Sequence, residues 1–350
     1  MKNQTVVVTG ASGYLGSWIT RYALEAGFTV RGTVRNPDDH EKTQHLRDLP
    51  GADRLSLHPA DLLEPRSFHP IVDGADAVIH SASPFFTQHV KNPREELVRP
   101  AVEGTRNVLT AAGAAPSVRR VVVTSSVAAM IADAREAAGH PGRRVDESCW
   151  NMVSSESYDP YSYSKTAAER TAWEDASCQS QWDLVTINPA FIIGPSLSRR
   201  LDATSVSLIR QLGDGTFRSG VPALTVGFVD VRDVAHAHIH ALSVPVASGR
   251  FILAERVATF PQMTRILRAR FGDTYPLPRR TVPKALFWLL APTLGIQRRY
   301  VARNVGIPFQ LDATRSRNVL GITYRDTRET LVEHFRQLID TGVLSAPPAR

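Results

Sequence analysis

A glycine-rich turn near the N-terminus follows a short run of β-branched residues. The run TVVVTG at 5–10 has the composition of a buried strand, and TGASGYLGSW at 9–18 places Gly10, Gly13 and Gly16 before a helix-like stretch. In such a turn the first glycine allows a tight reversal, the second lets a pyrophosphate approach the backbone, and the third lets the helix pack on the strand. The helix N-terminus presents free N–H groups to a phosphate. The pattern predicts a dinucleotide-binding βαβ unit, whose further cofactor contacts are expected to be Ser12, Tyr14 and Leu15.

Strand-like and helix-like segments alternate through the first half of the chain. Strand-like runs lie at 28–35, 55–62, 75–83, 119–126 and 183–195, and helix-like stretches end near residue 26 or cover 94–114 and 160–178. This alternation predicts an α/β fold with a Rossmann-type, doubly wound parallel sheet. After about residue 195 glycine and proline interrupt the rhythm. We therefore expect a cofactor-binding domain at 1–195, joined by part of 225–250, and a smaller C-terminal substrate-binding lobe at 196–345.

Composition is that of a globular protein with no strong bias. The chain has 350 residues, of which 43% are hydrophobic and 21% charged, and a formal net charge of +7. The basic residues are scattered as pairs rather than gathered into a block with aromatic residues, so we expect no nucleic-acid partner. Two cysteines without a pairing framework, and an N-terminus without an apolar signal region, indicate reduced thiols in a cytoplasmic protein.

The longest apolar run is ALFWLLAPTLGI at 285–296. It is too short to span a bilayer and contains Pro292, so stable membrane insertion is not expected. We expect a buried helix here, with a membrane-surface or substrate-facing helix as the alternative.

The end of the second strand bears on the choice between NAD and NADP. An NAD enzyme usually places an acidic residue there to bind the ribose 2′-hydroxyl. In RGTVRNPDD at 31–39 the strand ends at Arg35, and the acids come later. A guanidinium suits a 2′-phosphate, and Lys42 could add a second cation, so the sequence favours NADPH over NAD. At the end of the third strand, Asp61 is expected to accept from the adenine amino group, with Leu62 beside it.

The stretch DPYSYSK at 159–165 combines two tyrosines with one lysine at the start of a helix-like segment. Residues four apart share a helix face, whereas residues two apart do not. Tyr161 can therefore lie beside Lys165, and Tyr163 cannot. A nearby cation is expected to lower the pKa of the Tyr161 phenol towards the range useful for acid–base catalysis.

A hydroxyl that orients a substrate oxygen is expected at the end of the strand VVVTSSVAAM, 121–130. The strand ends in Thr124, Ser125 and Ser126 at the carboxyl edge of the sheet, where ligands of such folds bind. Ser126 is the preferred candidate, with Ser125 as the alternative, and Thr124 is expected to contact the cofactor. Ser126 and Tyr161 are also expected to contact the substrate.

Several further motifs accompany these: PADL, HSASPF (80–85), AVEGTRNVL (101–109), DESCW (146–150) and NPAFIIGP (188–195). Over roughly residues 4–245 the chain resembles the extended short-chain dehydrogenase/reductases, and within them the group of dihydroflavonol 4-reductase, cinnamoyl-CoA reductase and yeast methylglyoxal (aldehyde) reductase. The resemblance implies catalytic roles for Ser126, Tyr161 and Lys165 and a 2′-phosphate site at Arg35 and Lys42. It also implies a nicotinamide wall from Pro189 to Ile192. By the same resemblance the cofactor ribose and pyrophosphate would be lined by Ser81, Ala82 and Ser83, and the substrate pocket bordered by Phe85 and Phe86.

The histidines of HAHIH at 236–240 could suggest a metal site. The surrounding sequence reads as a helix, on which only His236 and His240 are neighbours, so we expect structural histidines and no metal. Cys178 is expected to be a packed thiol.

The sequence thus predicts an NADPH-dependent carbonyl reductase that acts on a small ketone or aldehyde, as a monomer or homodimer. The alternatives are a hydroxysteroid or secondary-alcohol dehydrogenase working in the oxidative direction, an NAD-dependent nucleotide-sugar epimerase or dehydratase, and a cofactor sensor without activity.

Overall fold

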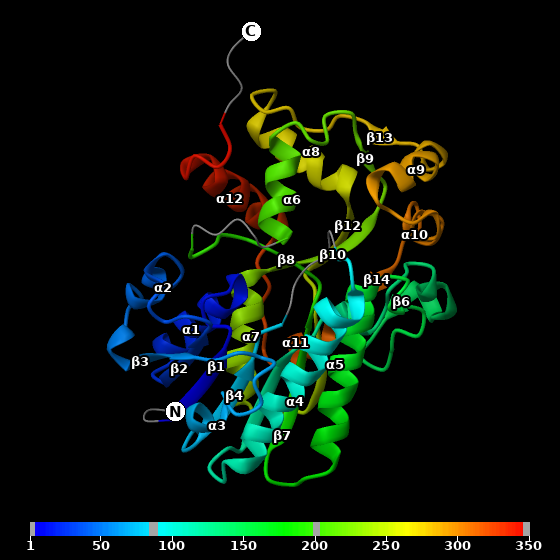
Figure 1. The fold of residues 1–350 in the computed structure, drawn as a ribbon. Helices are drawn as coiled ribbons and strands as arrows, with labels where there is room; N and C mark the ends of the chain where they lie inside the picture. Colours follow the sequence, from blue (N-terminus) through cyan, green and yellow to red (C-terminus); the bar gives the residue numbers. More distant parts are fainter. Residues whose placement is uncertain (1–3, 84–89, 199–203, 346–350) are drawn as a thin grey trace.

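The fold is built on a parallel sheet, seen in a computed structural model that describes residues 4–83, 90–198 and 204–345 (Figure 1). In this part of the chain the main sheet has seven strands in the order β11-β7-β5-β4-β1-β2-β3, and every pairing is parallel. Its strands are β1 (Thr5–Thr9), β2 (Thr29–Val34), β3 (Leu55–Pro59), β4 (Ala77–His80), β5 (Arg120–Thr124), β7 (Asp183–Pro189) and β11 (Gly249–Leu253).

Strand order reverses between β1 and β4, which are paired in register with Val6 opposite Ala77 and Thr9 opposite His80. In open α/β sheets the ligand crevice lies at such a switch point, outside the carboxyl ends of the strands. The glycine-rich turn follows β1 directly, and Ser81 to Ser83 follow β4. The Rossmann-type sheet predicted from the sequence is confirmed.

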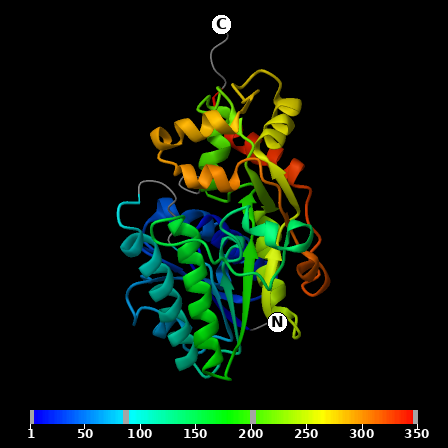
Figure 2. The same ribbon diagram turned by 90° about the vertical axis from the view of Figure 1, so that its right-hand side faces the viewer.

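Helices cover both faces of the sheet, because its strands are apolar on both sides. One face packs against α1 and α7, and the other against α3, α4 and α5, as Figure 2 shows from the side. The helices of this part are α1 (Tyr14–Glu25), α2 (His40–Arg47), α3 (His69–Val72), α4 (Arg99–Ala114), α5 (Pro160–Ser177), α7 (Val231–Ser243) and α11 (Thr314–Asn318).

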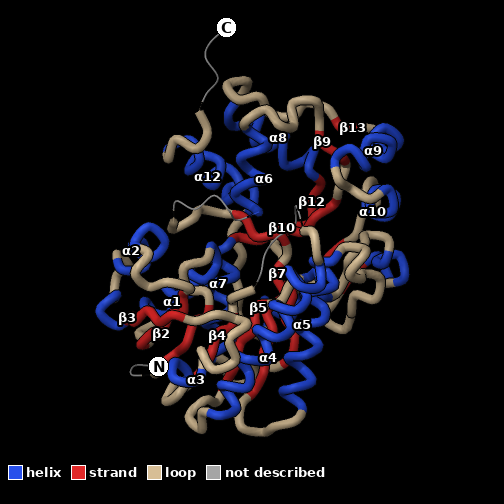
Figure 3. Tube along the Cα trace, in the orientation of Figure 1, coloured by secondary structure: helices blue, strands red, loops and turns tan. Residues whose placement is uncertain are grey.

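A smaller lobe sits above the carboxyl edge of the sheet, with its own core built around Phe335 and Leu267 (Figure 3). Its strands are β8 (Phe191–Ile193), β9 (Val221–Pro222), β10 (Thr225–Asp230), β12 (Arg256–Thr259) and β13 (Thr281–Val282), and its helices are α6 (Thr204–Gly213), α8 (Phe260–Phe271), α9 (Lys284–Leu290), α10 (Arg298–Asn304) and α12 (Thr327–Asp340). A short pair, β6 (Arg144–Val145) with β14 (Gln310–Leu311), lies beside it.

The single strand expected at 183–195 is two strands in two sheets. β7 ends at Pro189 in the main sheet, and β8 pairs with β10 in a three-stranded sheet of the lobe. The chain changes sheet at Ala190, whose N–H still donates to Leu253 O at 2.9 Å. Pro189 and Ile192, expected to wall the nicotinamide, therefore lie on either side of the junction between the two sheets.

The buried helix expected at 285–296 is wrong. The segment forms α9 and the short 3-10 helix η6 (Ala291–Leu294), and α9 has no buried residue. The helix α9 lies at the edge of the lobe, and of its side chains only Phe287 packs against the small buried cluster of Ala291, Val301 and Val305. Across the described ranges, no helix has the length and apolar character needed to cross a membrane.

Candidate active site

The glycine-rich turn forms a close-packed cradle at the start of α1. Gly10 has φ +68°, and a side-chain carbon there would lie 3.1 Å from Ala82, in the loop after β4. A side-chain carbon on Gly16 would lie 2.1 Å from Gly10 O, which no rearrangement of a side chain can relieve. Gly13 is the N-cap residue and provides no side-chain cap, so the first N–H groups of α1 can bind phosphate oxygens. These features fit a dinucleotide.

A buried hydrogen-bond network joins the ends of β1 and β4 behind this cradle. The Thr9 hydroxyl lies 2.9 Å from His80 Nδ1 and accepts from the N–H groups of Ser81 and Ala82. The Ser81 hydroxyl donates to Thr9 O at 2.6 Å. Burial lowers the pKa of His80 to about 3, so the ring is neutral at physiological pH. Ser81 is therefore tied to the strand end, while Ser83 lies one residue beyond Ala82.

The two cations expected to bind a 2′-phosphate have different surroundings. Arg35 follows β2 and is exposed. Lys42 lies in the first turn of α2, where its Nζ is 2.6 Å from the carboxylate of Asp39, the N-cap residue of that helix. Lys42 thus has an acidic partner in the protein, and Arg35 is the better placed of the two to meet an added phosphate.

Asp61 and Leu62 occupy the turn after β3. One Asp61 oxygen accepts from the Leu63 N–H at 2.8 Å, which holds the turn. The Leu62 side chain packs against Gly104 of α4, where an added side-chain carbon would lie 3.0 Å away. Both residues thus lie at the carboxyl edge of the sheet, beyond β2.

Tyr14 and Leu15 are expected to contact the cofactor, but the side chains of both contact other parts of the protein. Tyr14 donates to Gly194 O at 2.7 Å, across to the loop that follows β8. Burial and the nearby Asp230 raise the pKa of Tyr14 well above its usual value. Leu15 packs on the core of the main domain, and Ser12 is partly buried in the turn. The side chain of Tyr14 links the phosphate turn to the lobe.

The helix α5 begins at Pro160 and carries Tyr161 and Lys165 one turn apart on one face. Asp159 caps it from a left-handed conformation (φ 50°), and its carboxylate accepts from the Ser162 hydroxyl at 2.5 Å. Lys165 Nζ lies 5.9 Å from the centre of the Tyr161 ring. The structure thus brings together the pair that helical spacing selects.

The pKa values in this pair differ from the expectation. Burial raises the pKa of Tyr161 above its usual range, a hydrogen bond with Ser126 lowers it, and Asp159 raises it further. Burial alone lowers the pKa of Lys165 to about 8. The expected lowering of the Tyr161 pKa by Lys165 is therefore not seen: loss of hydration dominates at both residues and disfavours both charged forms.

The two serines after β5 face different partners. Ser126 is hydrogen-bonded to Tyr161, and its hydroxyl also accepts from the Ala128 N–H at 3.1 Å. Ser125 donates to the buried carboxylate of Glu169 at 2.5 Å. The geometry separates the two candidates, because only Ser126 lies beside the phenol.

A buried ion pair supports this strand end, and sequence reasoning missed it. Glu169 is 1% exposed and lies on the same face of α5 as Tyr161 and Lys165, two turns on; its carboxylate is 2.6 Å from Arg250 Nε. Asn188 donates to Glu169 at 2.7 Å and to Ser126 O at 3.3 Å. A signal was available: a carboxylate eight residues after Tyr161 falls on the helix face that the tyrosine and lysine bury.

Thr124, expected to contact the cofactor, has its hydroxyl 2.7 Å from His238 Nε2, and the other nitrogen of the His238 ring lies 2.8 Å from Val234 O.

The helix expected around HAHIH is α7. His236 stacks on Tyr22 with ring centres 3.8 Å apart, and His240 Nδ1 is 2.6 Å from Leu320 O. The described residues contain no group of three or more His, Cys, Asp or Glu that could hold a metal ion. Cys178, expected to be packed, is exposed at the end of α5.

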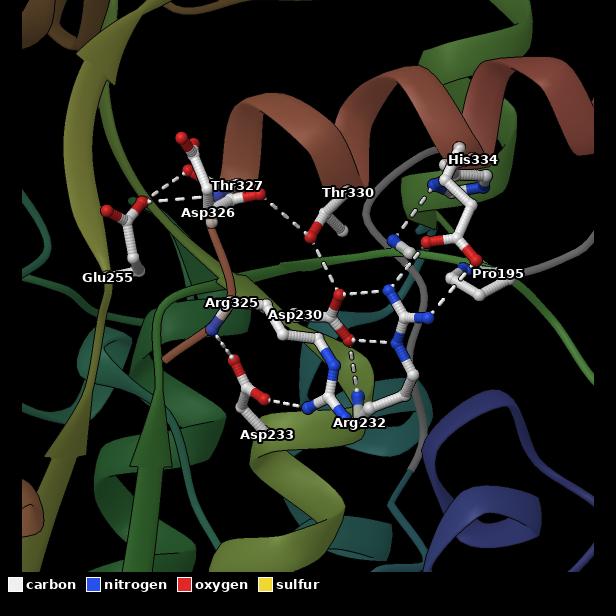
Figure 4. Close-up of polar contacts among 12 residues, drawn as sticks. Pro195, Asp230, Arg232, Asp233, Glu255, Arg325, Asp326, Thr327, Thr330 and His334 are labelled. Atoms are coloured by element: carbon white, nitrogen blue, oxygen red, sulfur yellow. Dashed lines mark hydrogen bonds and ion pairs between the residues drawn. The ribbon is translucent and has the colours of Figure 1, made fainter. Parts of the chain in front are cut away.

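A polar network fixes the lobe against the main domain (Figure 4). Asp230, at the end of β10, is fully buried and accepts from Arg232 at 2.6 Å and from the Thr330 hydroxyl at 2.7 Å. Arg232 also binds Glu333, on the same helix α12. The sequence before α12 is held by the ion pair of Asp233 with Arg325. The contacts with Arg325, Thr330 and Glu333 join residues 92 to 101 positions apart, so no local pattern predicts them.

Phe85 and Phe86 lie outside the described residues. Their expected place at the substrate pocket stays a prediction.

The chain is similar to known proteins in sequence and in fold. Residues 6–253 match the model of the NAD dependent epimerase/dehydratase family. The chain is 42% identical to cinnamoyl-CoA reductase 1 of Petunia hybrida over 80% of this chain and 81% of that one. It is 34% identical to tetraketide alpha-pyrone reductase 1 of Arabidopsis thaliana over 97% of both chains. Gre2 of Candida albicans, solved in complex with NADPH, superposes with a TM-score of 0.78 at 27% identity, covering 96% of this chain and 99% of that one.

The family match runs from Val6 in β1 to Leu253 at the end of β11, and includes the glycine-rich turn, the TSS strand end and the tyrosine–lysine pair. The two sequence relatives named above are both reductases. The chain is a member of the NAD dependent epimerase/dehydratase family, the extended short-chain dehydrogenase/reductases.

Proposed function

We propose that this protein is an NADPH-dependent reductase that converts the carbonyl group of a small ketone or aldehyde into an alcohol. The observation that carries the proposal is the meeting of Ser126, Tyr161 and Lys165 at the carboxyl edge of the sheet, where the glycine-rich turn also lies. The relatives, which are reductases, support the same reaction class.

Tyr161 is the proton donor in this proposal. A donor must hold its proton until charge develops on the substrate oxygen, and burial keeps the phenol protonated at neutral pH. Ser126, hydrogen-bonded to the phenol, would donate to the same substrate oxygen. As the oxygen takes the tyrosine proton, the cationic Lys165 would stabilise the phenolate that remains, and solvent would later return a proton.

NADPH would supply the hydride that the carbonyl carbon receives. The turn from Gly10 to Gly16 would bind its pyrophosphate, and Arg35 its 2′-phosphate. Exposure of Arg35, together with the pairing of Lys42 with Asp39, supports Arg35 as the main contact.

The substrate would bind between the carboxyl edge of the sheet and the lobe. In this proposal residues 1–195 and part of 225–250 form the cofactor domain, and residues 196–345 form the substrate-binding lobe. Because relatives include cinnamoyl-CoA reductases, cinnamoyl-CoA thioesters are a further candidate substrate class; their carbonyl carbon would take the hydride and release CoA as its thiol, which gives an aldehyde. We also propose a cytoplasmic protein, monomeric or homodimeric; its two cysteines, both free thiols, support that location.

The test is the loss of NADPH absorbance with a panel of aldehydes, α-dicarbonyls, aryl ketones, dihydroflavonols, ketosteroids and cinnamoyl-CoA thioesters, run in parallel with NADH. We expect turnover of at least one carbonyl substrate, faster with NADPH. Folded protein that binds NADPH and reduces none of them would contradict the proposal. Bound NAD that copurifies with the protein and no net oxidation would instead favour an epimerase or dehydratase.

A further inference from the structure

The helical pair α9 and α10, with η6 between them, exposes an unusual amount of apolar surface. Among the described residues eight large hydrophobic side chains are exposed, and five of them lie between 286 and 294. These five are Leu286, Trp288, Leu289, Leu290 and Leu294, with exposed fractions from 41% to 59%. Single exposed hydrophobic residues are ordinary, but a contiguous group marks a binding surface. We call these five residues the apolar face.

The segment that carries the apolar face is also strongly basic. Residues 274–311 contain six Lys or Arg and no Asp or Glu. Two of these cations reach acids outside the segment: Arg279 pairs with Asp273, and Arg303 with Asp133. Within the described ranges, the other four lie in no ion pair: Arg280, Lys284, Arg298 and Arg299.

Two of these cations, Lys284 and Arg298, lie close to the apolar face, and Arg280 precedes α9 by four residues. The Arg298 guanidinium sits 4.5 Å from the centre of the Trp288 ring, and Lys284 precedes Leu286 in the same helix. Lys284 Nζ donates to Ala302 O at 2.9 Å, which ties the start of α9 to α10. Long cationic side chains beside tryptophan and leucine have the composition of surfaces that rest at a membrane interface.

The helical pair is a firm part of the molecule. Ala291, Val301 and Val305 form a buried cluster beneath it, to which Phe287 adds. On its inner side Gln297 donates to Ser157 O at 2.8 Å, and the Arg299 guanidinium lies 4.0 Å from the Tyr158 ring centre. Figure 1 shows both helices at the outer edge of the lobe. The helical pair is therefore packed against the rest of the protein on its inner side, and the apolar face is exposed to solvent.

We propose that the apolar face binds the surface of an anionic lipid bilayer, with Leu286, Leu289 and Leu294 entering the headgroup region and the exposed Arg280 and Arg298 meeting lipid phosphates. This interaction goes beyond the proposed reductase activity and does not depend on it. A bilayer satisfies both halves of the surface, because it offers an apolar interior and fixed negative charge.

A second copy of the chain fits less well. In a two-fold symmetric dimer the same patch faces itself, which would bring the unpaired cations of both copies together without any acid from residues 274–311. Like charges placed opposite one another oppose such an interface.

The test is co-sedimentation of the full chain with vesicles of phosphatidylcholine alone and of phosphatidylcholine mixed with phosphatidylglycerol. We expect binding to the anionic vesicles at about 0.1 M ionic strength, little binding to neutral ones, and loss at about 1 M. The double variant Arg280→Gln/Arg298→Gln should bind roughly 25-fold more weakly, since each cation contributes about five-fold at an anionic surface.

The matched pair Leu289→Glu and Val246→Glu separates the apolar face from a general effect of added negative charge. Val246 is 76% exposed on the turn between α7 and β11, and Leu289 is 59% exposed. We expect Leu289→Glu to lower vesicle binding at least ten-fold more than Val246→Glu, with unchanged circular dichroism and melting temperature for both.

Absence of wild-type binding to anionic vesicles, or equal loss in the two variants, would overturn the proposal. So would a wild-type dimer that Leu289→Glu converts to a monomer, measured by light scattering, since the face would then be a self-interface. Reductase activity in solution is a separate readout, so failure of either proposal leaves the other intact.

Discussion

Arginine and lysine occur in two opposite settings in this protein: the interior of the main domain and the surface around the helical pair α9 and α10. In the interior Arg250, in β11, is 7% exposed and its guanidinium lies against Glu169, while Lys165 is buried next to Tyr161. Arg280, just before β13, and Arg298, in α10, are exposed and lie in no ion pair among the described residues. The comparison teaches that burial, not residue type, decides whether a cation supports the fold or is left for a partner.

The physical reason lies in hydration. A buried charge loses water and must recover that energy from a partner, so its removal or exchange is costly. An exposed charge keeps its water and costs the fold almost nothing, which leaves it available to an anion. The predictions below test this difference in order of expected size.

The largest effect is expected for Tyr161→Phe. Removal of the proton donor should lower turnover by about 10² to 10⁴, while NADPH binding measured by fluorescence and vesicle binding persist. Leu289→Glu should lower vesicle binding and leave turnover and NADPH binding unchanged. If both variants lose the same property, the two regions do not have separate roles.

Glu169→Gln should destabilise the protein by about 3–5 kcal/mol, because it leaves the buried Arg250 charge without its partner. Arg250 Nη2 already lacks a hydrogen-bond partner among the described residues, so little can replace the lost contact. Arg298→Gln should stay within about 0.5 kcal/mol. Urea denaturation measures both.

A double variant guards against simple failure to fold. Glu169→Leu/Arg250→Met replaces the pair by apolar side chains and should recover most of the stability lost in Glu169→Gln. A double variant less stable than Glu169→Gln would mean that the packing of this site, not the unpaired charge, determines the loss.

Lys165 provides a pH-dependent test. Burial lowers its pKa from 10.5 to about 8, so the unfolded chain binds more protons between these values. The folded protein bears the full cost of the buried charge below about pH 8, and stability from this group rises as the pH increases towards 10.5. Lys165→Met should therefore be more stable than wild type at neutral pH, by up to roughly 3 kcal/mol.

That gain should shrink as the pH rises to about 10, which urea denaturation at two pH values measures. A variant less stable than wild type at neutral pH would show that contacts of Lys165 with its neighbours outweigh the cost of its burial.

The smallest effects are expected at the 2′-phosphate site. Arg35→Ser should weaken NADPH binding about 10- to 100-fold, because a charge-assisted hydrogen bond contributes roughly 1.5–3 kcal/mol, and should leave NADH binding nearly unchanged. Lys42→Gln should have less effect, since its ammonium already lies against Asp39. Titration of each variant with both cofactors measures this, and a greater loss for Lys42→Gln would reverse the assignment.

Sequence predictions succeeded where a feature depends on local contacts, and failed where it depends on contacts between distant segments. The glycine-rich turn, the alternation of strands and helices, and the spacing of Tyr161 and Lys165 are all local, and the fold they predict is confirmed. Glu169 was missed because its meaning depends on Arg250, which lies 81 residues away. The segment 183–195 was predicted as one strand because both of its halves are apolar. Only the pairing of β8 with β10 shows that the second half leaves the main sheet.

By itself the sequence determined the parallel sheet, its phosphate-binding turn and the helix face shared by Tyr161 and Lys165, since each follows from short-range geometry. Only the tertiary structure shows that Ser126 and not Ser125 lies beside the phenol, and that most of the apolar run at 285–296 is exposed. In each case the deciding quantity is burial or a neighbouring charge. Those depend on which distant segments pack together, and no residue spacing records that.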